Sequence, residues 1–187
     1  RYAKAYQKVT PRVLFEAGGN VLRRQRGGQK LLLENLWPKL KLVVSVDYRL
    51  TTTGLHSDYV LPAAQHYEKL GHSMPSVHHM NYVLCDRAAE PVGEALPDLE
   101  IGFRLLEKIE ERAAARGMAD FVDASGQTRK IAGLVDTISH KGVLRDEEKR
   151  ADEAIRDSAV HGVLPKGTTL ATLREKGFVR WTGWGNV

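Results

Sequence analysis

The chain has 187 residues, 42% of them hydrophobic and 27% charged, which is the composition of an ordinary globular domain rather than of a disordered chain. Its single cysteine, Cys85, excludes an internal disulfide framework and any cysteine-ligated zinc or iron–sulfur site built from this chain alone. The net charge of +5 favours an anionic partner, and no run of about eighteen apolar residues is present that could form a membrane-spanning helix.

A strand that runs into a glycine turn is the first predicted element. Residues 13–17 are apolar except for one glutamate, and Gly18-Gly19-Asn20 follow at once. Glycines at the end of a strand permit positive φ angles and let a ligand approach the backbone closely.

The densest basic run of the chain, Arg23-Arg24-Gln25-Arg26, comes next. A solvated surface turn is its ordinary interpretation, and the phosphates of a nucleotide-like ligand are the alternative. We do not expect nucleic-acid binding, because the run has no interleaved aromatic residues. Leucines over residues 29–36 then predict a helix that ends at Pro38.

Two further strands are predicted over residues 40–47 and 56–64, separated by a hydroxyl-rich loop at 51–54. The second strand is apolar nearly throughout, as strands buried on both faces are, and it closes on Asp47. Open α/β sheets hold ligands at such strand ends, so the glycine turn and Asp47 are expected to line one crevice. There a carboxylate could accept hydrogen bonds from ribose hydroxyls or from the N–H groups of guanine. A turn or cap role for Asp47 is the alternative.

A long irregular segment, 67–95, is expected to cover this crevice. Cys85 lies in it and is interpreted as a packing thiol. Asp98 is then a candidate N-cap for a helix that ends near residue 117 and packs on the sheet.

Residues 118–187 differ in composition from the rest of the chain. A densely charged stretch at 145–159 predicts an exposed helix, residues 168–177 a short capped helix, and 178–181 a strand. We therefore expect an α/β fold with a partial doubly wound, mainly parallel sheet in a domain over 1–117. A mostly helical or irregular extension or linker is expected over 118–187.

Six ordered motifs between residues 18 and 98 make the chain resemble the molybdopterin oxidoreductases of the dimethyl sulfoxide reductase family. They are Gly18-Gly19-Asn20, Val46-Asp47, Thr51-Thr52-Thr53, Ser57-Asp58-Tyr59-Val60-Leu61-Pro62-Ala63, Glu68-Lys69-Leu70-Gly71 and Pro91-Val92-Gly93-Glu94-Ala95-Leu96-Pro97-Asp98. The section around Gln65 and the histidines that follow it most resembles the respiratory branch. That branch contains nitrate, selenate and chlorate reductases and dimethylsulfide and ethylbenzene dehydrogenases.

This resemblance implies a molybdenum bis(molybdopterin guanine dinucleotide) cofactor, with one guanosine half resting on this chain. Matched position by position, the expected contacts are the side chains of Asn20, Asp47, Lys69 and Asp98 and the backbone of Gly18, Gly19 and Val46. His78 is a candidate for a hydrogen bond to the pterin, against the ordinary interpretation of a surface or packing histidine. Asp98 is fully explained by a cap, and Asp58 is expected to have a structural role as a cap that holds the turn, with a ligand contact as the alternative.

The family's molybdenum ligand and its [4Fe-4S] cluster ligands lie upstream of the matched region. The chain is therefore expected to be an internal fragment of a catalytic subunit that has no activity alone. The resemblance implies an iron–sulfur electron-transfer subunit as partner, leaves a haem subunit open, and implies a small-molecule substrate. Periplasmic localisation is expected, with a cytoplasmic or membrane-associated complex left open. The alternative function is a non-catalytic α/β module that binds a guanine nucleotide or a partner protein. It has no Gly-Lys-Ser/Thr phosphate loop, which argues against a nucleotide hydrolase.

Overall fold

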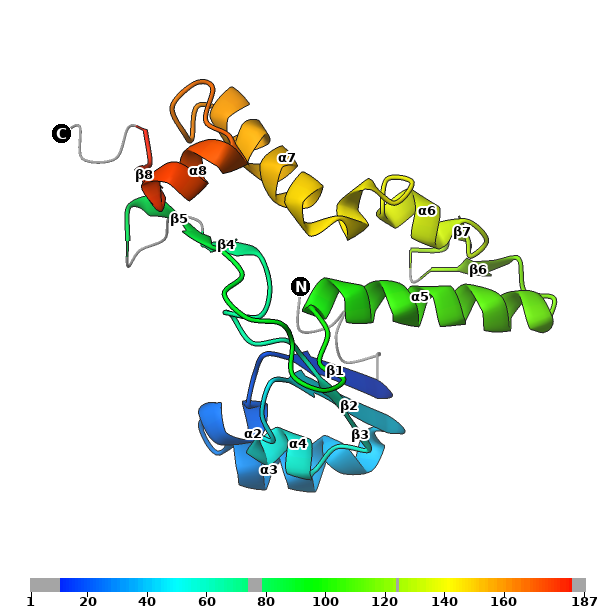
Figure 1. Ribbon diagram of the computed structural model, residues 1–187. Coiled ribbons are helices and arrows are strands. Elements are labelled where there is room, and N and C mark those ends of the chain that lie inside the picture. The colour runs from blue at the N-terminus through cyan, green and yellow to red at the C-terminus, as the bar shows by residue number, and fades with distance from the viewer. Residues whose placement is uncertain (1–10, 74–78, 124, 183–187) are drawn as a thin grey trace. The chain divides into compact units, whose positions relative to one another are not determined.

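A computed structural model describes residues 11–73, 79–123 and 125–182 of the chain (Figure 1). The described residues form two compact units. The first contains residues up to 64 together with 92–98, and the second contains 65–91 together with residues from 99 onward. The predicted division at residue 117 concerned the extent of a nucleotide-binding domain and stays a prediction.

The first unit is built on a parallel three-stranded sheet, as predicted. Strand β1 (Val13–Ala17) pairs with β2 (Leu42–Asp47), which pairs with β3 (Tyr59–Pro62). β2 is the central strand, and its residues 43–47 are all buried, which accounts for its near-continuous apolar sequence. The α/β class and the three predicted strands are confirmed.

Short helices cover one face of this sheet (Figure 1). They are α2 (Val21–Arg24), α3 (Gly28–Asn35), the 3-10 turn η1 (Trp37–Lys39) and α4 (Thr52–Leu55). Helix α3 confirms the helix predicted before Pro38. The hydroxyl-rich stretch predicted as a loop is instead the helix α4, because Thr51 caps it by accepting a hydrogen bond from the backbone N–H of Gly54 at 3.1 Å.

The second unit contains most of the remaining helices and two small antiparallel sheets. Its strands are β4 (Gly71–Ser73), β5 (Asn81–Cys85), β6 (Asp120–Val122), β7 (Thr128–Lys130) and β8 (Phe178–Arg180), with β5 between β4 and β8. Its helices are α5 (Asp98–Ala115, whose first residue belongs to the first unit), α6 (Leu134–Ile138), the 3-10 turn η2 (Val143–Arg145), α7 (Glu147–Val160) and α8 (Leu170–Lys176). None of the described helices is both long and apolar enough to cross a membrane.

Helix α5 confirms the predicted helix, although Asp98 is its first residue rather than the residue before it. Its packing on the sheet stays a prediction. The expected irregular segment 67–95 is corrected in part, since it contains β4 and β5, which pair in antiparallel register. Cys85, at the end of β5, is exposed, so its interpretation as a packing thiol was wrong.

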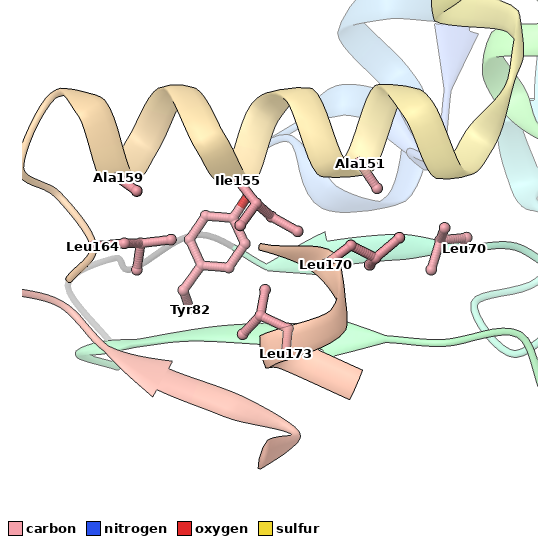
Figure 2. Packing of buried hydrophobic residues seen from close by; sticks show 8 residues of the cluster. All are labelled: Leu70, Tyr82, Ala151, Ile155, Ala159, Leu164, Leu170 and Leu173. Atoms are coloured by element: carbon pink, nitrogen blue, oxygen red, sulfur yellow. The ribbon is translucent and has the colours of Figure 1, made fainter. Parts of the chain in front are cut away.

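The hydrophobic core of the second unit lies between α7, α8 and the β4–β5 strands (Figure 2). Its members are buried side chains from two stretches that are distant in sequence, 70–82 and 151–173: Leu70, Tyr82, Ala151, Ile155, Ala159, Leu164, Leu170 and Leu173. Helix α7 confirms the helix predicted in this stretch, but it buries one face, so the expectation that it is exposed was wrong in part. Helix α8 and strand β8 are as predicted, and Thr169 forms a capping box with Thr172 at the start of α8.

Candidate functional site

The ends of β1 and β2 lie side by side at one edge of the first unit's sheet. Ala17 is in register with Val46, and the backbone N–H of Gly18 donates to the carbonyl of Val46 at 2.9 Å. The next residue along β2, Asp47, is in register with Pro62 of β3. We call the ends of these three strands the carboxyl edge. It brings the predicted glycine turn and Asp47 together.

The two glycines of the turn are needed for different reasons. Gly18 has a φ angle of +65°, and a Cβ added to it would meet no atom within 4 Å, so the constraint on it is conformational. A Cβ on Gly19 would lie 2.5 Å from Oε1 of Glu16, an oxygen that also accepts the backbone N–H of Val21 at 2.6 Å. Gly19 therefore leaves space for the Glu16 carboxylate, which accepts the N–H of the first residue of helix α2. Sequence analysis missed this role of Glu16.

Asn20 is held to helix α4 by its side-chain oxygen. Its Oδ1 accepts hydrogen bonds from the backbone N–H of Thr53 at 3.2 Å and from the Thr53 hydroxyl at 3.1 Å. The fully buried Thr53 hydroxyl in turn accepts the backbone N–H of Leu22 at 3.3 Å. Because the Asn20 oxygen is used within the protein, this side chain would meet a ligand through its NH2 donors.

Asp47 is a buried carboxylate, with 7% of its surface exposed. Its Oδ1 accepts the backbone N–H of Arg49 at a long 3.3 Å, and its backbone carbonyl accepts the N–H of Ala63 at 3.1 Å. By contrast, Asp58 is committed to the sheet, because its Oδ2 accepts the backbone N–H of Val43 at 2.8 Å. The structural role expected for Asp58 is therefore found, whereas Asp47 combines a turn contact with a place at the carboxyl edge.

Asp98 follows a short extension of the same sheet. Leu96 pairs with Ala63 in a parallel bridge, through hydrogen bonds from Leu96 N to Pro62 O at 3.2 Å and from Ala64 N to Leu96 O at 2.8 Å. Since the bridge is parallel, the chain leaves it in the direction of the carboxyl edge, and Asp98 comes two residues later. No sequence pattern indicated this bridge.

Two hollows border the basic run that follows the glycine turn. One, of about 480 Å³, is lined by residues that include Glu16, Gly19, Asn20 and Arg24. The other, of about 500 Å³, is lined by residues that include Arg23, Lys30 and Thr52. The basic run identified in the sequence therefore borders concave surface close to the predicted site, where positive charge favours an anionic group.

Lys69 belongs to the second unit and is half-buried just before β4. His78 lies outside the described residues, and the neighbouring His79 is bound through its ring to the Asn81 carbonyl at 2.9 Å and to the Ser73 hydroxyl at 3.1 Å. Among the described residues, no group of three or more His, Cys, Asp or Glu side chains is placed to hold a metal ion.

Comparisons with known proteins agree with the resemblance identified in the sequence. The family model for molybdopterin oxidoreductase matches residues 2–108. The chain is 36% identical over 167 residues to perchlorate reductase subunit alpha of Dechloromonas aromatica (strain RCB), covering 89% of the chain and 17% of that protein. It is 39% identical over 148 residues to respiratory nitrate reductase subunit alpha of Haloferax mediterranei, covering 79% of the chain and 14% of that protein.

A third relative is dimethylsulfide dehydrogenase subunit alpha of Rhodovulum sulfidophilum, 31% identical over 165 residues, which cover 88% of the chain and 18% of that protein. The chain thus spans less than a fifth of the length of each of these relatives.

Proposed function

Because the chain belongs to the molybdopterin oxidoreductase family, we propose that its carboxyl edge binds the guanosine half of a bis(molybdopterin guanine dinucleotide) cofactor. The family itself implies a molybdenum–pterin cofactor. The observation that supports the guanosine assignment is Asp47, a buried carboxylate at the end of the central strand beside an open glycine turn.

The residues at the carboxyl edge fit such a group by their chemistry. The carboxylate of Asp47 can accept the paired N–H donors of a guanine edge, and charge-assisted hydrogen bonds of this kind are strong. The NH2 group of Asn20 can donate to a ligand oxygen, because its own oxygen is held by Thr53. The space beside Gly18 lets a ligand approach the backbone closely. Arg23 and Arg24 border the two hollows, where their guanidinium groups could bind phosphate oxygens.

When bound, the molybdenum cofactor supplies oxygen-atom transfer coupled to the movement of two electrons. The part of the protein described here would orient and retain it. The full-length protein would act as an oxidoreductase on a small molecule in anaerobic respiration. It would carry a [4Fe-4S] cluster upstream and pass electrons to an iron–sulfur subunit, with a haem subunit left open. The relatives named above are alpha subunits, which supports the presence of further subunits. We propose a periplasmic location.

The test is Asp47→Ala in the full-length enzyme, read as molybdenum by metal analysis and as GMP released by acid hydrolysis, both per mole of protein. Hydrogen bonds to charged groups contribute about 1.5–3 kcal/mol each, so cofactor affinity should fall by a factor of roughly 10 to 100 or more. The control is Asp58→Ala, which removes a carboxylate whose hydrogen bond among the described residues is to the neighbouring strand of the same sheet. Full molybdenum and GMP content in Asp47→Ala would refute the assignment.

The alternative, a free-standing guanine-nucleotide-binding module, makes a different prediction. The chain from residue 1 to 187 would then gain thermal stability with GDP or GTP. No gain is expected on the present proposal, because the chain carries only part of a dinucleotide site.

A further inference from the structure

The segment that carries Lys69 is held in place by a carboxylate from a distant helix. The backbone N–H of Leu70 donates to Oε2 of Glu147, the first residue of α7, at 3.4 Å. The same oxygen accepts the Arg87 guanidinium at 2.6 Å. Glu147 is 77 residues from Leu70 in sequence, so this contact is a product of the fold rather than of local structure.

The other end of the segment is fixed by backbone contacts. The carbonyl of Tyr67 accepts the N–H groups of Ala88 at 2.8 Å and Ala89 at 3.0 Å. The side chain of Leu70 is buried in the core of the second unit (Figure 2). Lys69 thus lies between a backbone clamp at Tyr67 and an anchored Leu70.

Glu147 is placed there at an energetic cost. Its side chain is only 17% exposed, and its Oε1 is buried without a hydrogen-bond partner among the described residues. Burying part of a carboxylate is unfavourable, and an ion pair recovers that cost only in part. Hydrogen bonding to Glu147 raises the pKa of Arg87, so the guanidinium keeps its charge beside that carboxylate. Such a group is weak as a source of stability, which points to a role in holding a conformation.

We propose that Glu147 is a positioning residue: through its hydrogen bond to Leu70 N and its ion pair with Arg87, it fixes the Lys69 backbone so that the ammonium group meets an anionic oxygen of the cofactor. The inference rests on the proposed function, extended to Lys69 as the cofactor contact that the family resemblance implies. A lysine is a point charge on a flexible stem, so its contribution to affinity depends on how well its backbone is ordered before binding.

The test uses the full-length enzyme and two readouts other than activity. Hydrogen exchange at the Leu70 amide reports the Glu147 contact itself. Molybdenum and released GMP per mole of protein report cofactor retention. Glu147→Ala removes the contact, and Glu147→Gln keeps an oxygen that can accept from Leu70 N. The matched control is Glu148→Ala, since Glu148 belongs to the same charged cluster but pairs with Arg174 at 2.8 Å and makes none of the described contacts with Leu70.

In Glu147→Ala we expect exchange at Leu70 to be about tenfold faster, which is the loss of about 1.4 kcal/mol from a hydrogen bond to a charged group. Its cofactor content should fall by the same factor as in Lys69→Met, and the double variant should be no worse than Lys69→Met. Glu147→Gln should recover most of the content, and Glu148→Ala should match the wild type. If Glu147→Ala does not fold, Glu147→Asp, shorter by one methylene, gives the same comparison.

The outcomes separate the inference from the proposed function. If Lys69→Met keeps full cofactor content, Lys69 is not a contact, and the assignment on which the inference rests is wrong. If Lys69→Met loses cofactor but the folded Glu147 variant does not, only the positioning role is wrong. If the two losses add in the double variant, Glu147 acts through general stability and the positioning role is again refuted.

Discussion

Thr53→Val should damage the candidate site without touching any residue predicted to bind the cofactor. The substitution keeps the shape of the side chain and removes only the hydroxyl. That hydroxyl donates to Asn20 Oδ1 at 3.1 Å and accepts from Leu22 N at 3.3 Å. Thr53 itself has no exposed surface. One change therefore weakens the link of the glycine turn to α4 and leaves the Leu22 N–H unpaired.

The expected loss can be worked from these two contacts. Leaving a buried donor unsatisfied costs about 1–3 kcal/mol, and the lost neutral hydrogen bond adds about 0.5–1.5 kcal/mol. The Leu22 contact is long, which favours the lower half of the range, so we expect about 2–3 kcal/mol. Against a typical total stability of about 5–15 kcal/mol, such a loss is large but not fatal to folding.

Hydrogen exchange of the Leu22 amide in the full-length enzyme measures this loss directly, as faster exchange by a factor of roughly 30 to 150. GMP and molybdenum content should fall with it, because the turn that presents Asn20 is loosened. Thr52→Val is the matched control: the same change one residue earlier in α4, at a hydroxyl that makes none of the described hydrogen bonds. Equal effects of the two valines on Leu22 exchange would refute the reasoning.

Two further predictions concern the second unit. Ile155→Ala removes a fully buried side chain of the core in Figure 2 and should lower the free energy of unfolding by about 2–5 kcal/mol. Val160→Ala, on the same helix but 81% exposed, should change it by no more than about 0.5 kcal/mol. Hydrogen exchange of the α7 amides compares the two variants, and equal effects would contradict the packing described above. Burial, followed by the charge of Arg150, lowers the pKa of His72 below its ordinary 6.5, so the unfolded chain binds the proton first on acidification. Stability of this unit should therefore be full above about pH 6.5 and fall as the pH drops toward the folded pKa, and His72→Gln should flatten that dependence in urea titrations at pH 5 to 8.

The elements that the sequence predicted correctly are those whose signals are local. The strands at 13–17 and 42–47 and the capped helix at 170–176 each carry their own apolar run, glycine or cap. The pairing of β4 and β5 was missed because these strands are short and because β5 takes its other neighbour, β8, from almost a hundred residues later. The core face of α7 was missed because two of its buried apolar residues are alanines set among charges.

In the candidate site, too, the features with local sequence signals could be predicted and those that depend on distant contacts could not. The glycine turn and Asp47 could be predicted, since strand order alone brings strand ends to one edge. The groups that hold these residues could not be predicted. Thr53 is 33 residues from Asn20, the Leu96–Ala63 bridge is a single pair, and Glu147 is 77 residues from the Leu70 amide that it binds. Such partners share no sequence pattern with the residues they support, because the contact exists only once the fold has formed.

Asn20→Asp separates a structural role of this side chain from a binding role. A carboxylate oxygen can still accept both hydrogen bonds from Thr53, at 3.2 and 3.1 Å, so the turn and the stability of the first unit should be retained. The substitution replaces the NH2 donors with an acceptor that carries negative charge. If these donors meet an oxygen of the cofactor, the contact becomes repulsive, and molybdenum and GMP content should fall at least tenfold while Leu22 exchange stays at the wild-type rate. Unchanged cofactor content in Asn20→Asp would mean that Asn20 serves α4 alone. The guanosine site would then rest on Asp47 and the backbone of the glycine turn.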